Sequence, residues 1–352
     1  MEGEIKNLFL VWSTVLASLC YCHTISKLIP TGNNNNLKPL LISPIICLFL
    51  VLPQNLTSIH LGGTTSFFIS WLANFKLILF AFNKGPLSSN PPIPLTKFIP
   101  LACFPIKLQN PKSTISKRPS KSTLNYVIKI AFLAAVMRIY NYKDQIHPHI
   151  VLFFYCLHIY FMLEMGLALF AFVAKSLLRV ELEPQFDEPY LATSLQDFWG
   201  RRWNMMVSNI LKPTVYGPVK SLSARLISGQ WAPIPAVLAT FVVSGLMHEL
   251  VFYNIGRLRP TGEVMGFFVI QGLSLSFEIV VKKVLDGKFM GPGFVSRPLT
   301  LVYVMYTSFW LFFPPFLRGK AEFKACTETL AFVEFVKTRR LVGPSDMSCP
   351  FL

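Results

Sequence analysis

The feature that most constrains the fold of this chain is a series of uncharged segments long enough to cross a lipid bilayer. The first, residues 7–26, contains no charged side chain and lies between Lys6 and Lys27. The apolar core of a bilayer is about 30 Å thick, and a helix of about 20 apolar residues crosses it. Because lipid cannot satisfy backbone polar groups, such a segment folds as a helix. Acidic residues precede this one and no small-residue cleavage site follows, so we interpret it as a retained span rather than a signal peptide.

The composition of the chain points the same way. Of its 352 residues, 53% are hydrophobic and 14% are charged. A soluble domain carries about 25% charged residues, so this chain has too few to cover a water-facing surface. The chain has 33 Lys and Arg against 17 Asp and Glu. These basic residues form no run typical of a nucleic-acid-binding arm, so we expect no nucleic-acid partner. In a membrane protein this excess marks cytosolic loops. A second interpretation of the basic excess is that it attracts a polyanionic substrate.

The apolar segments predict an all-α, polytopic membrane protein with eight or nine transmembrane helices. The expected helices are residues 7–26, two within 39–82, a short segment at 96–108, and residues 124–142, 150–174, 234–255, 266–281 and 298–317. The short segment is either a tilted span or a re-entrant one. No internal repeat divides the chain, so residues 1–352 are expected to form a single integral-membrane domain.

The loops predict the topology. The basic loops 110–123 and 282–297, together with the polar interval 175–231, are expected in the cytosol. Alternation of the helices then places the amino terminus in the cytosol as well, across the membrane from the turn that follows 234–255. On this topology the glycosylation sequon Asn55-Leu56-Thr57 faces the cytosol and stays unmodified.

The seven cysteines lie at positions 20, 22, 47, 103, 156, 326 and 349. Their spacing matches neither a zinc site nor a disulfide framework. All seven are therefore expected to act as small apolar residues, and no metal is implied.

Lys76, His158 and Glu164 lie inside expected spans, where ionisable groups are costly. Lys76 is expected to pair, face a cavity or extend its amine to the membrane surface. His158 and Glu164 lie on different faces of their helix, so each is expected to pair with another helix rather than share a proton relay.

The longest polar interval of the chain is 181–219, which we interpret as a motif-bearing segment on the cytosolic side. Its centre, DFWGRRWN at 197–204, places aromatic rings, an acid, two arginines and an amide within eight positions. Such a mixture suits a membrane interface, or a site where an anionic ligand meets an apolar one.

His248 lies in the apolar stretch FVVSGLMHEL at 241–250. A lone histidine on an apolar segment is usually a core residue that bonds a neighbouring helix. Here its depth in a spanning helix and the adjacent Glu249 favour a functional role. Ser244 and Gly245, one turn earlier, are expected to thin the helix and make room for a substrate.

The segment LEPQFDEPYLATSLQDFWGRRWN at 182–204 resembles the signature of the plant long-chain-alcohol O-fatty-acyltransferases, the wax synthases. These form a branch of the membrane-bound O-acyltransferase (MBOAT) superfamily. WLANFKLILFAFNKGPLS (71–88) and VVSGLMHELVFYNIGRLRP (242–260) are also similar to that family. Plant acyl-CoA:sterol acyltransferases share these motifs, so the resemblance specifies the reaction better than the acceptor.

The resemblance implies an MBOAT-like fold in the endoplasmic reticulum membrane and an enzyme that esterifies an alcohol with the acyl group of an acyl-CoA, without a cofactor. The family's intramembrane histidine matches His248, and its upstream asparagine matches Asn204. Neutral histidine is a suitable proton acceptor for an alcohol hydroxyl. The Asn204 amide would donate to the thioester carbonyl or hold the CoA arm, and a helix cap is the alternative.

Four further motif residues are candidates for substrate binding. Arg201 and Arg202 would contact the phosphates of CoA, although positive-inside flanking accounts for them equally well. Trp199 and Trp203 belong to the same motif and are included with them.

The expected partners are acyl-CoA, a long-chain fatty alcohol or a sterol, and the bilayer. The sequence leaves the oligomeric state open and allows a homo-oligomer. The competing function within the same class is a sterol O-acyltransferase. A membrane transporter is the competing function from another class, but it would show inverted repeats and broken helices that meet at the midplane.

Overall fold

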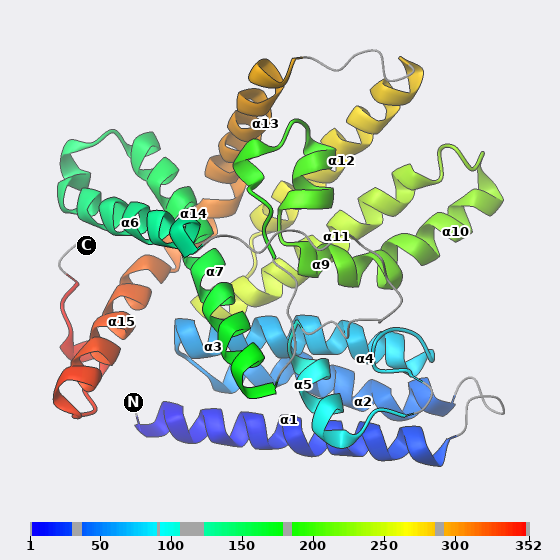
Figure 1. The fold of residues 1–352 in the computed structure, drawn as a ribbon, viewed down its shortest axis with the longest axis horizontal. Helices are drawn as coiled ribbons and strands as arrows, with labels where there is room; N and C mark the ends of the chain where they lie inside the picture. The colour runs from blue at the N-terminus through cyan, green and yellow to red at the C-terminus, as the bar shows by residue number, and fades with distance from the viewer. Residues whose placement is uncertain are drawn as a thin grey trace.

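The computed structural model describes residues 2–29, 37–89, 92–105, 123–178, 185–285 and 292–349. Most of these residues are helical (Figure 1). Eight helical segments are long and apolar enough to cross a membrane: Gly3–Leu28, Leu37–Asn55, Ile59–Ala81, Leu124–Gln145, Pro148–Phe172, Pro233–Gly256, Glu263–Val284 and Gly293–Arg318. The expectation of an all-α, multi-pass membrane protein is thus confirmed.

The helices fall into an amino-terminal bundle, a hairpin and a carboxyl-terminal group. The bundle contains α1 (Glu2–Leu28), α2 (Leu37–Val51), α3 (Ile59–Ser66), α4 (Asn74–Ala81) and α5 (Leu95–Cys103). The hairpin is α6 (Thr123–Ile139) and α7 (Pro148–Leu178). The short helices α8 (Leu195–Asp197), α9 (Met205–Leu211) and α10 (Gly217–Leu226) then lead to α11 (Pro233–Gly256), α12 (Glu263–Val284), α13 (Gly293–Thr307), α14 (Phe313–Arg318) and α15 (Ala321–Thr338).

The amino-terminal bundle packs around one apolar core. Val11, Val15 and Leu19 recur every four residues on α1 and are essentially fully buried in it. Polar side chains inside this core bond backbone carbonyls of α2. Ser70 donates to the Phe49 carbonyl at 2.7 Å. Such bonds remove the cost of an unsatisfied polar group in an apolar surrounding, and they fix α3–α4 against α2.

The described part of the short segment expected at 96–108 is too short to span the membrane. Helix α5 has nine residues and rises only about 14 Å, less than half of a bilayer core. Its start lies beside His23, which bonds the Ile93 carbonyl at 2.9 Å. Its end lies beside Trp12, whose ring stacks on Phe104 at 6.2 Å. Because Trp12 lies near the middle of α1, α5 ends inside the membrane.

Lys76 satisfies the end of this half-helix. Its amine donates to the carbonyls of Leu101 at 2.6 Å and Phe104 at 2.5 Å. The terminal carbonyls of a helix carry a partial negative charge, which a cation stabilises. The expectation that Lys76 pairs within the membrane is confirmed, and its partner is backbone.

The half-helix changes the topology. Three described helical segments of the amino-terminal bundle, rather than four, are long enough to span the membrane, and the amino terminus lies on the same face as the turn after α11. Arg257 of that turn donates to the carbonyls of Gln54 at 2.7 Å and Leu56 at 2.5 Å. The expected placement of the amino terminus and of the sequon at Asn55 across the membrane from this turn is therefore wrong.

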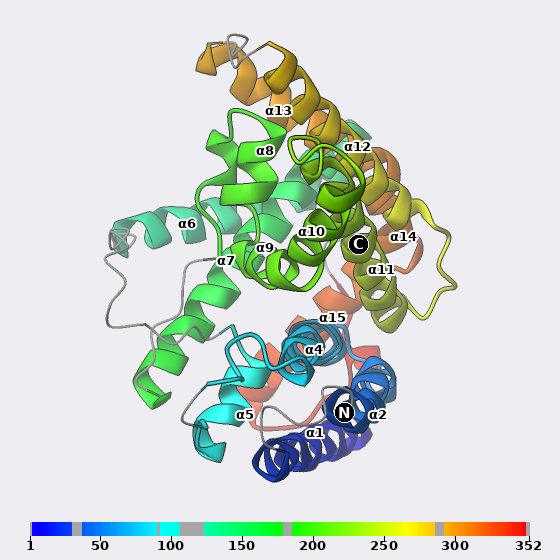
Figure 2. The same cartoon turned by 90° about the vertical axis from the view of Figure 1, so that its right-hand side faces the viewer.

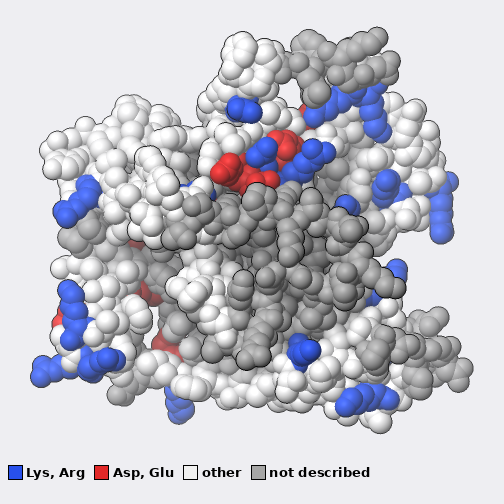
Figure 3. All heavy atoms as spheres, viewed as in Figure 1, with Lys and Arg blue, Asp and Glu red and all other residues white. Residues whose placement is uncertain are grey.

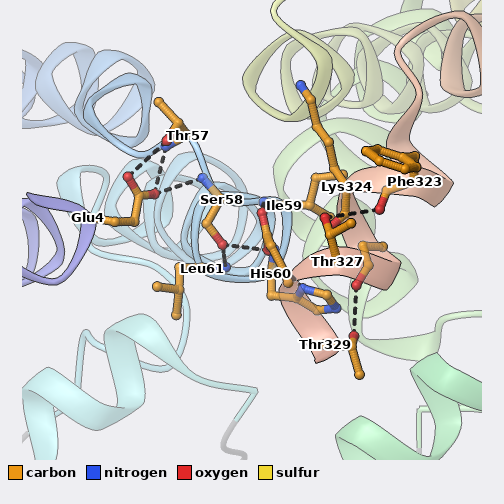
Figure 4. Close-up of polar contacts among 12 residues, drawn as sticks. Glu4, Thr57, Ser58, Ile59, His60, Leu61, Phe323, Lys324, Thr327 and Thr329 are labelled. Atoms are coloured by element: carbon orange, nitrogen blue, oxygen red, sulfur yellow. Dashed lines mark hydrogen bonds and ion pairs between the residues drawn. The ribbon is translucent and has the colours of Figure 1, made fainter. Parts of the chain in front are cut away.

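We call this face, which carries residues 4, 52–58, 257–262 and α15, the tail face. The opposite face, which carries residues 227–232 and the facing ends of α12 and α13, is the signature face. Helix α15 is fastened to the tail face by the carboxylate of Glu328. Its partners Ser58, Ile59 and His60 are labelled in Figure 4. The carboxylate accepts the Ser58 hydroxyl at 2.7 Å, the Ile59 N–H at 2.8 Å and a bond from the His60 ring at 2.9 Å. An acid here caps the start of α3, where the helix dipole favours negative charge.

The tail face also carries a disulfide. Cys326 of α15 is bonded to Cys349, with their Cα atoms 5.9 Å apart. The expectation that all seven cysteines are unpaired thiols is therefore wrong. The two cysteines are 23 positions apart, and a helix and a returning tail connect them, so their proximity depends on a tertiary turn that spacing does not reveal.

His158 and Glu164 of α7 each pair with the other arm of the hairpin, as expected. Glu164 is bonded to Lys129 of α6 at 2.7 Å. His158 shares a hydrogen bond of 3.2 Å with the hydroxyl of Tyr140. The expected cytosolic loop 110–123 lies almost wholly outside the described residues.

The disulfide indicates on which side of the membrane each face lies. Disulfides persist in oxidising compartments such as the lumen of the endoplasmic reticulum, so we expect the tail face to be lumenal and the signature face cytosolic. In sealed microsomes, tags at the amino terminus and after Leu352 should both be protected, whereas a tag beside Lys220 should react. An amino-terminal tag that reacts while the carboxyl-terminal tag stays protected would restore the sequence-based topology.

The Glu328 cap predicts a pH dependence of stability. Burial raises the pKa of Glu328, but the hydrogen bonds from His60, Ser58 and Ile59 outweigh it and hold the pKa below the ordinary value of 4.5. The stabilisation is therefore complete above about pH 4.5 and is lost as the pH falls through the folded pKa. Glu328→Gln should lower the free energy of unfolding by about 1–3 kcal/mol near neutral pH.

Thermal unfolding of purified protein measures this effect. The difference between wild type and Glu328→Gln should shrink as the pH falls below that ordinary pKa. Glu334→Gln on the same helix is the control. Equal unfolding temperatures for wild type and Glu328→Gln near neutral pH would show that the cap contributes nothing.

Candidate active site

His248 lies in the middle of α11, inside a cage of aromatic rings. Its ring stacks on Phe268 with centroids 4.2 Å apart and meets Trp71 edge-on at 4.8 Å and Phe312 at 6.0 Å. Its Nδ1 lies 2.8 Å from the Ser244 carbonyl. A carbonyl can only accept, so Nδ1 carries the hydrogen and Nε2 keeps the lone pair. The backbone of α11 thus selects the tautomer in which Nε2 is the proton acceptor.

The cage exists because α11 and α12 cross at very short range. A Cβ atom on Gly245 would lie 2.8 Å from the sulfur of Met265 and 3.2 Å from the Cβ of Phe268. A Cβ atom on Gly272 would lie 2.9 Å from the Cβ of Phe241. Small residues at such crossings let two membrane helices approach closely. The space expected beside Gly245 for a substrate is therefore filled by α12.

We call residues 185–204, the described part of the motif, the signature segment. Its own charged side chains hold it in its fold. Arg202 forms an ion pair with Asp197 at 2.8 Å and donates to the Asp187 carbonyl at 3.0 Å. Glu278 of α12 accepts the N–H of Leu195 at 2.8 Å and caps the start of α8. The segment is thus pinned to the signature-face end of α12. Figure 3 shows acidic and basic side chains together over this segment.

The two arginines of the motif have different surroundings. Arg202 is occupied by the ion pair just described. Arg201 is exposed at the signature face and is therefore placed where a phosphate can reach it.

Trp199 points from the signature segment into the core. Its Nε1 donates to Gln271 at 3.0 Å, and Gln271 in turn donates to the Thr307 hydroxyl at 2.8 Å. Gln271 is fully buried. The indole also lies edge-on to Phe241 at 5.6 Å and within 6.3 Å of Phe268. Trp199 is therefore tied to the ring that stacks on His248.

Trp203 and Asn204 are the last two residues of the signature segment and lead into α9. Trp203 stacks on Phe198 at 5.4 Å and meets Phe186 edge-on at 5.2 Å. Asn204 has a φ of 40° and is the N-cap of α9, with its oxygen accepting the Val207 N–H at 3.4 Å. Asparagine tolerates this left-handed conformation better than most residues. The structure thus shows the capping role for Asn204, and its oxygen is used for that role.

Asn204 and His248 are attached to one apolar cluster. Met206, two residues after Asn204, packs in it together with Trp71 and with Met247, the neighbour of His248. The two candidate catalytic residues, 44 positions apart in the sequence, are therefore held by the same packed side chains inside the membrane. Within the interval 175–231, Ile210 and Leu211 pack into the same cluster, and Phe198 packs with Val304 in a second one.

Several residues that position the site were missed from the sequence. Trp71 and Phe268 form the cage, and Gln271, Glu278 and Lys282 hold the signature. Gln271 and Glu278 are seven residues apart, so they share one face of an otherwise apolar helix. Polar side chains at such spacing inside a span are a signal that they bond a common neighbour.

A groove of about 730 Å³ lies on the other side of α11, near the tail face. Its lining includes Leu246, Glu249 and Tyr253, whose spacing of three and four residues places them on one helix face. His248 lies on the opposite face. Glu249 caps α12 by accepting the Met265 N–H at 3.0 Å, so the two adjacent ionisable residues act in different places.

With this geometry established, comparison with known proteins identifies the class. The sequence model of the Membrane bound O-acyl transferase family matches residues 182–270, which include the signature segment, Asn204 and His248. The chain belongs to this family, and it is an O-acyltransferase.

The related proteins narrow the class further. The chain is 41% identical over 351 residues to the long-chain-alcohol O-fatty-acyltransferase of Simmondsia chinensis, covering 97% of this chain and 98% of that protein. It is 42% identical to the probable long-chain-alcohol O-fatty-acyltransferase 9 of Arabidopsis thaliana, over 96% and 99% of the two chains. It is also 46% identical over 335 residues to the acyl-CoA–sterol O-acyltransferase 1 of Arabidopsis thaliana, over 94% and 96%. The chain thus belongs with the plant O-acyltransferases that the signature indicated.

Because the buried amide of Gln271 anchors Trp199, replacing it should affect both stability and turnover. Gln271→Leu removes the acceptor of the Trp199 indole N–H, which should cost about 1–3 kcal/mol of stability. The Thr307 hydroxyl keeps its bonds to the carbonyls of Tyr303 and Val304. Turnover per folded molecule should also fall, because Trp199 no longer braces Phe268 against His248.

The matched control is Ser274→Ala on the same helix. Its hydroxyl bonds the Tyr303 hydroxyl of α13 at 2.5 Å. Ester synthesis per folded molecule should stay near wild type in this control. Wild-type turnover in Gln271→Leu would show that the Trp199 anchor does not affect the site.

Proposed function

We propose that this enzyme transfers the acyl group of an acyl-CoA to the hydroxyl of a long-chain fatty alcohol, forming a wax ester and free CoA. The observation that carries this proposal is the geometry of His248. A histidine with its Nδ1 hydrogen fixed on a backbone carbonyl and its Nε2 left basic, inside an apolar aromatic cage, is suited to take a proton from an alcohol.

The reaction needs one proton transfer and one displacement. Nε2 of His248 accepts the hydroxyl proton as the alcohol oxygen attacks the thioester carbon. The C–O bond forms, the C–S bond breaks, and the proton passes to the departing thiolate. General-base catalysis of this kind contributes about 10²–10⁴-fold. Because the thioester is already activated, the transfer needs neither an acyl-enzyme nor a cofactor.

Asn204 is proposed to stabilise the charge that develops on the thioester oxygen. Its side-chain oxygen caps α9, so its NH₂ group is the part of the side chain that can donate to a substrate. A fixed donor aimed at a developing oxyanion is an effective catalytic group where water is excluded. The cap also fixes the side chain in advance of the reaction.

Acyl-CoA is proposed to approach from the signature face. Its phosphates would meet Arg201, and its acyl chain would enter the apolar core beside Trp203 and Trp199. This arrangement keeps the polyanionic part of the donor in water and brings the thioester to membrane depth. We further propose that the enzyme resides in the endoplasmic reticulum membrane, where the disulfide of the tail face would meet an oxidising lumen.

A sterol acceptor is the second candidate, supported by the 46% identity to the sterol O-acyltransferase. A sterol presents the same hydroxyl chemistry on a rigid ring system. The proton transfer at His248 would be the same for both acceptors, so the acceptor itself has to be determined by experiment.

Expression in a yeast strain that lacks its own neutral-lipid acyltransferases tests the proposal. Cells fed a long-chain fatty alcohol should accumulate wax esters, and cells fed a sterol or diacylglycerol should show little product. Sterol esters without wax esters would establish the second candidate. Absence of any ester would contradict both.

His248→Ala should lower turnover by about 10²–10⁴-fold at normal protein abundance, because the proton acceptor is lost. Binding of acyl-CoA should change little. His158→Ala, which removes a histidine from a different apolar span, should stay near wild type per folded molecule. Activity of His248→Ala within a few-fold of wild type would remove the histidine from the mechanism.

A further inference from the structure

The α6–α7 hairpin is weakly attached to the rest of the protein. Only 11% of the residues in the apolar window of each helix are buried, against 83% for the span Ile59–Ala81. In Figure 2 the start of α6 and the end of α7 lie at the left edge of the molecule. Most of the hairpin's apolar surface therefore faces lipid, and its position depends on a small number of contacts.

One of those contacts reaches the signature segment. Tyr160 of α7 lies edge-on to Phe186 at 5.7 Å and within 6.3 Å of the Trp203 ring. Trp203 immediately precedes Asn204, the N-cap of α9. The rotation of α7 about its axis therefore decides whether an aromatic ring supports the residue that leads into the proposed site.

An intramembrane ion pair fixes that rotation. Lys129 of α6 and Glu164 of α7 are bonded at 2.7 Å, with 6% and 5% of their side chains exposed. Glu164 lies four residues after Tyr160, so both side chains emerge from the same face of α7. The Lys129 amine also lies 5.8 Å from the centre of the Tyr160 ring. The pair and the aromatic contact are thus neighbours on one helix face.

We propose that Lys129 and Glu164 are positioning residues for acyl transfer. They hold Tyr160 against Trp203 and thereby set the orientation of Asn204. Lipid provides almost no driving force that would select one rotation of an apolar helix over another. A buried charge has a single good partner, so the pair specifies one arrangement where apolar side chains would allow several. The catalytic consequence rests on the proposed function.

The proposal predicts that the kinetic defect falls on kcat rather than on the KM for acyl-CoA. Glu164→Gln keeps the shape of the side chain but removes the charge that Lys129 pairs with. Because the defect acts on the orientation of Asn204, kcat per folded molecule should fall about 10- to 100-fold, as expected for a misplaced catalytic group. The KM for acyl-CoA should change much less. The exchanged pair, Lys129→Glu with Glu164→Lys, should recover most of the lost kcat.

A matched control lies in the same hairpin. Tyr140→Phe removes the hydrogen bond to His158, which also joins the two arms but lies away from the signature segment. Its kcat should stay near wild type. Tyr160→Leu should reproduce the defect of Glu164→Gln, and combining the two should add little further loss, because both act through one contact.

Limited proteolysis gives a readout that does not depend on activity. Trypsin cleavage after the exposed Arg201 should be faster in Glu164→Gln than in wild type and normal again in the exchanged pair. If wild type esterifies no acceptor, the proposed function fails, but this cleavage still decides the positioning role. Glu164→Gln with lower protein abundance, wild-type kcat per folded molecule and wild-type cleavage would overturn the inference.

Discussion

The close crossing of α11 and α12 is the constraint on which the rest of the structure depends. Gly245 and Gly272 leave no room for a side chain between the helices, so the crossing brings Phe268 onto the ring of His248. The same register places Gln271 under the Trp199 indole. A single helix contact therefore orients the proposed base and anchors the signature segment.

Polar groups in the apolar region show a second constraint. Each has to find its partner within the protein, because lipid offers none. His248 uses a carbonyl of its own helix, Lys76 uses the end of a half-helix, and Lys129 uses Glu164. These bonds join segments that hydrophobic packing alone would leave free to rotate or slide. In a membrane the polar minority thus determines much of the arrangement.

The signature segment is chiefly a folding unit. Arg202 and Asp197 pair with each other, Trp199 is hydrogen-bonded in the core, and Trp203 belongs to an aromatic stack. Most of the motif therefore fixes the path of the chain from the membrane surface to Asn204. This explains how a short motif identifies the reaction without specifying the acceptor, because the residues that fix this path need not contact the alcohol.

The sequence by itself determined the membrane class, the spans, the family and His248 as the principal candidate. Hydropathy is a property of about 20 consecutive residues, and the motif is contiguous, so both can be read without knowledge of the fold. The pairing of His158 and Glu164 with neighbouring helices also followed from local helix geometry.

Only the tertiary structure decided which segments meet. It showed that α5 is too short to span the membrane, that the amino terminus lies on the same face as the turn after α11, that Cys326 is bonded to Cys349, and that Gly245 is packed against α12. It also assigned Gln271 and Glu328 their roles, through contacts with residues 72 and 270 positions away. The physical reason is that helix propensity and hydropathy are local, whereas a hydrogen bond, a disulfide or a close crossing depends on side chains that only the folded chain brings together.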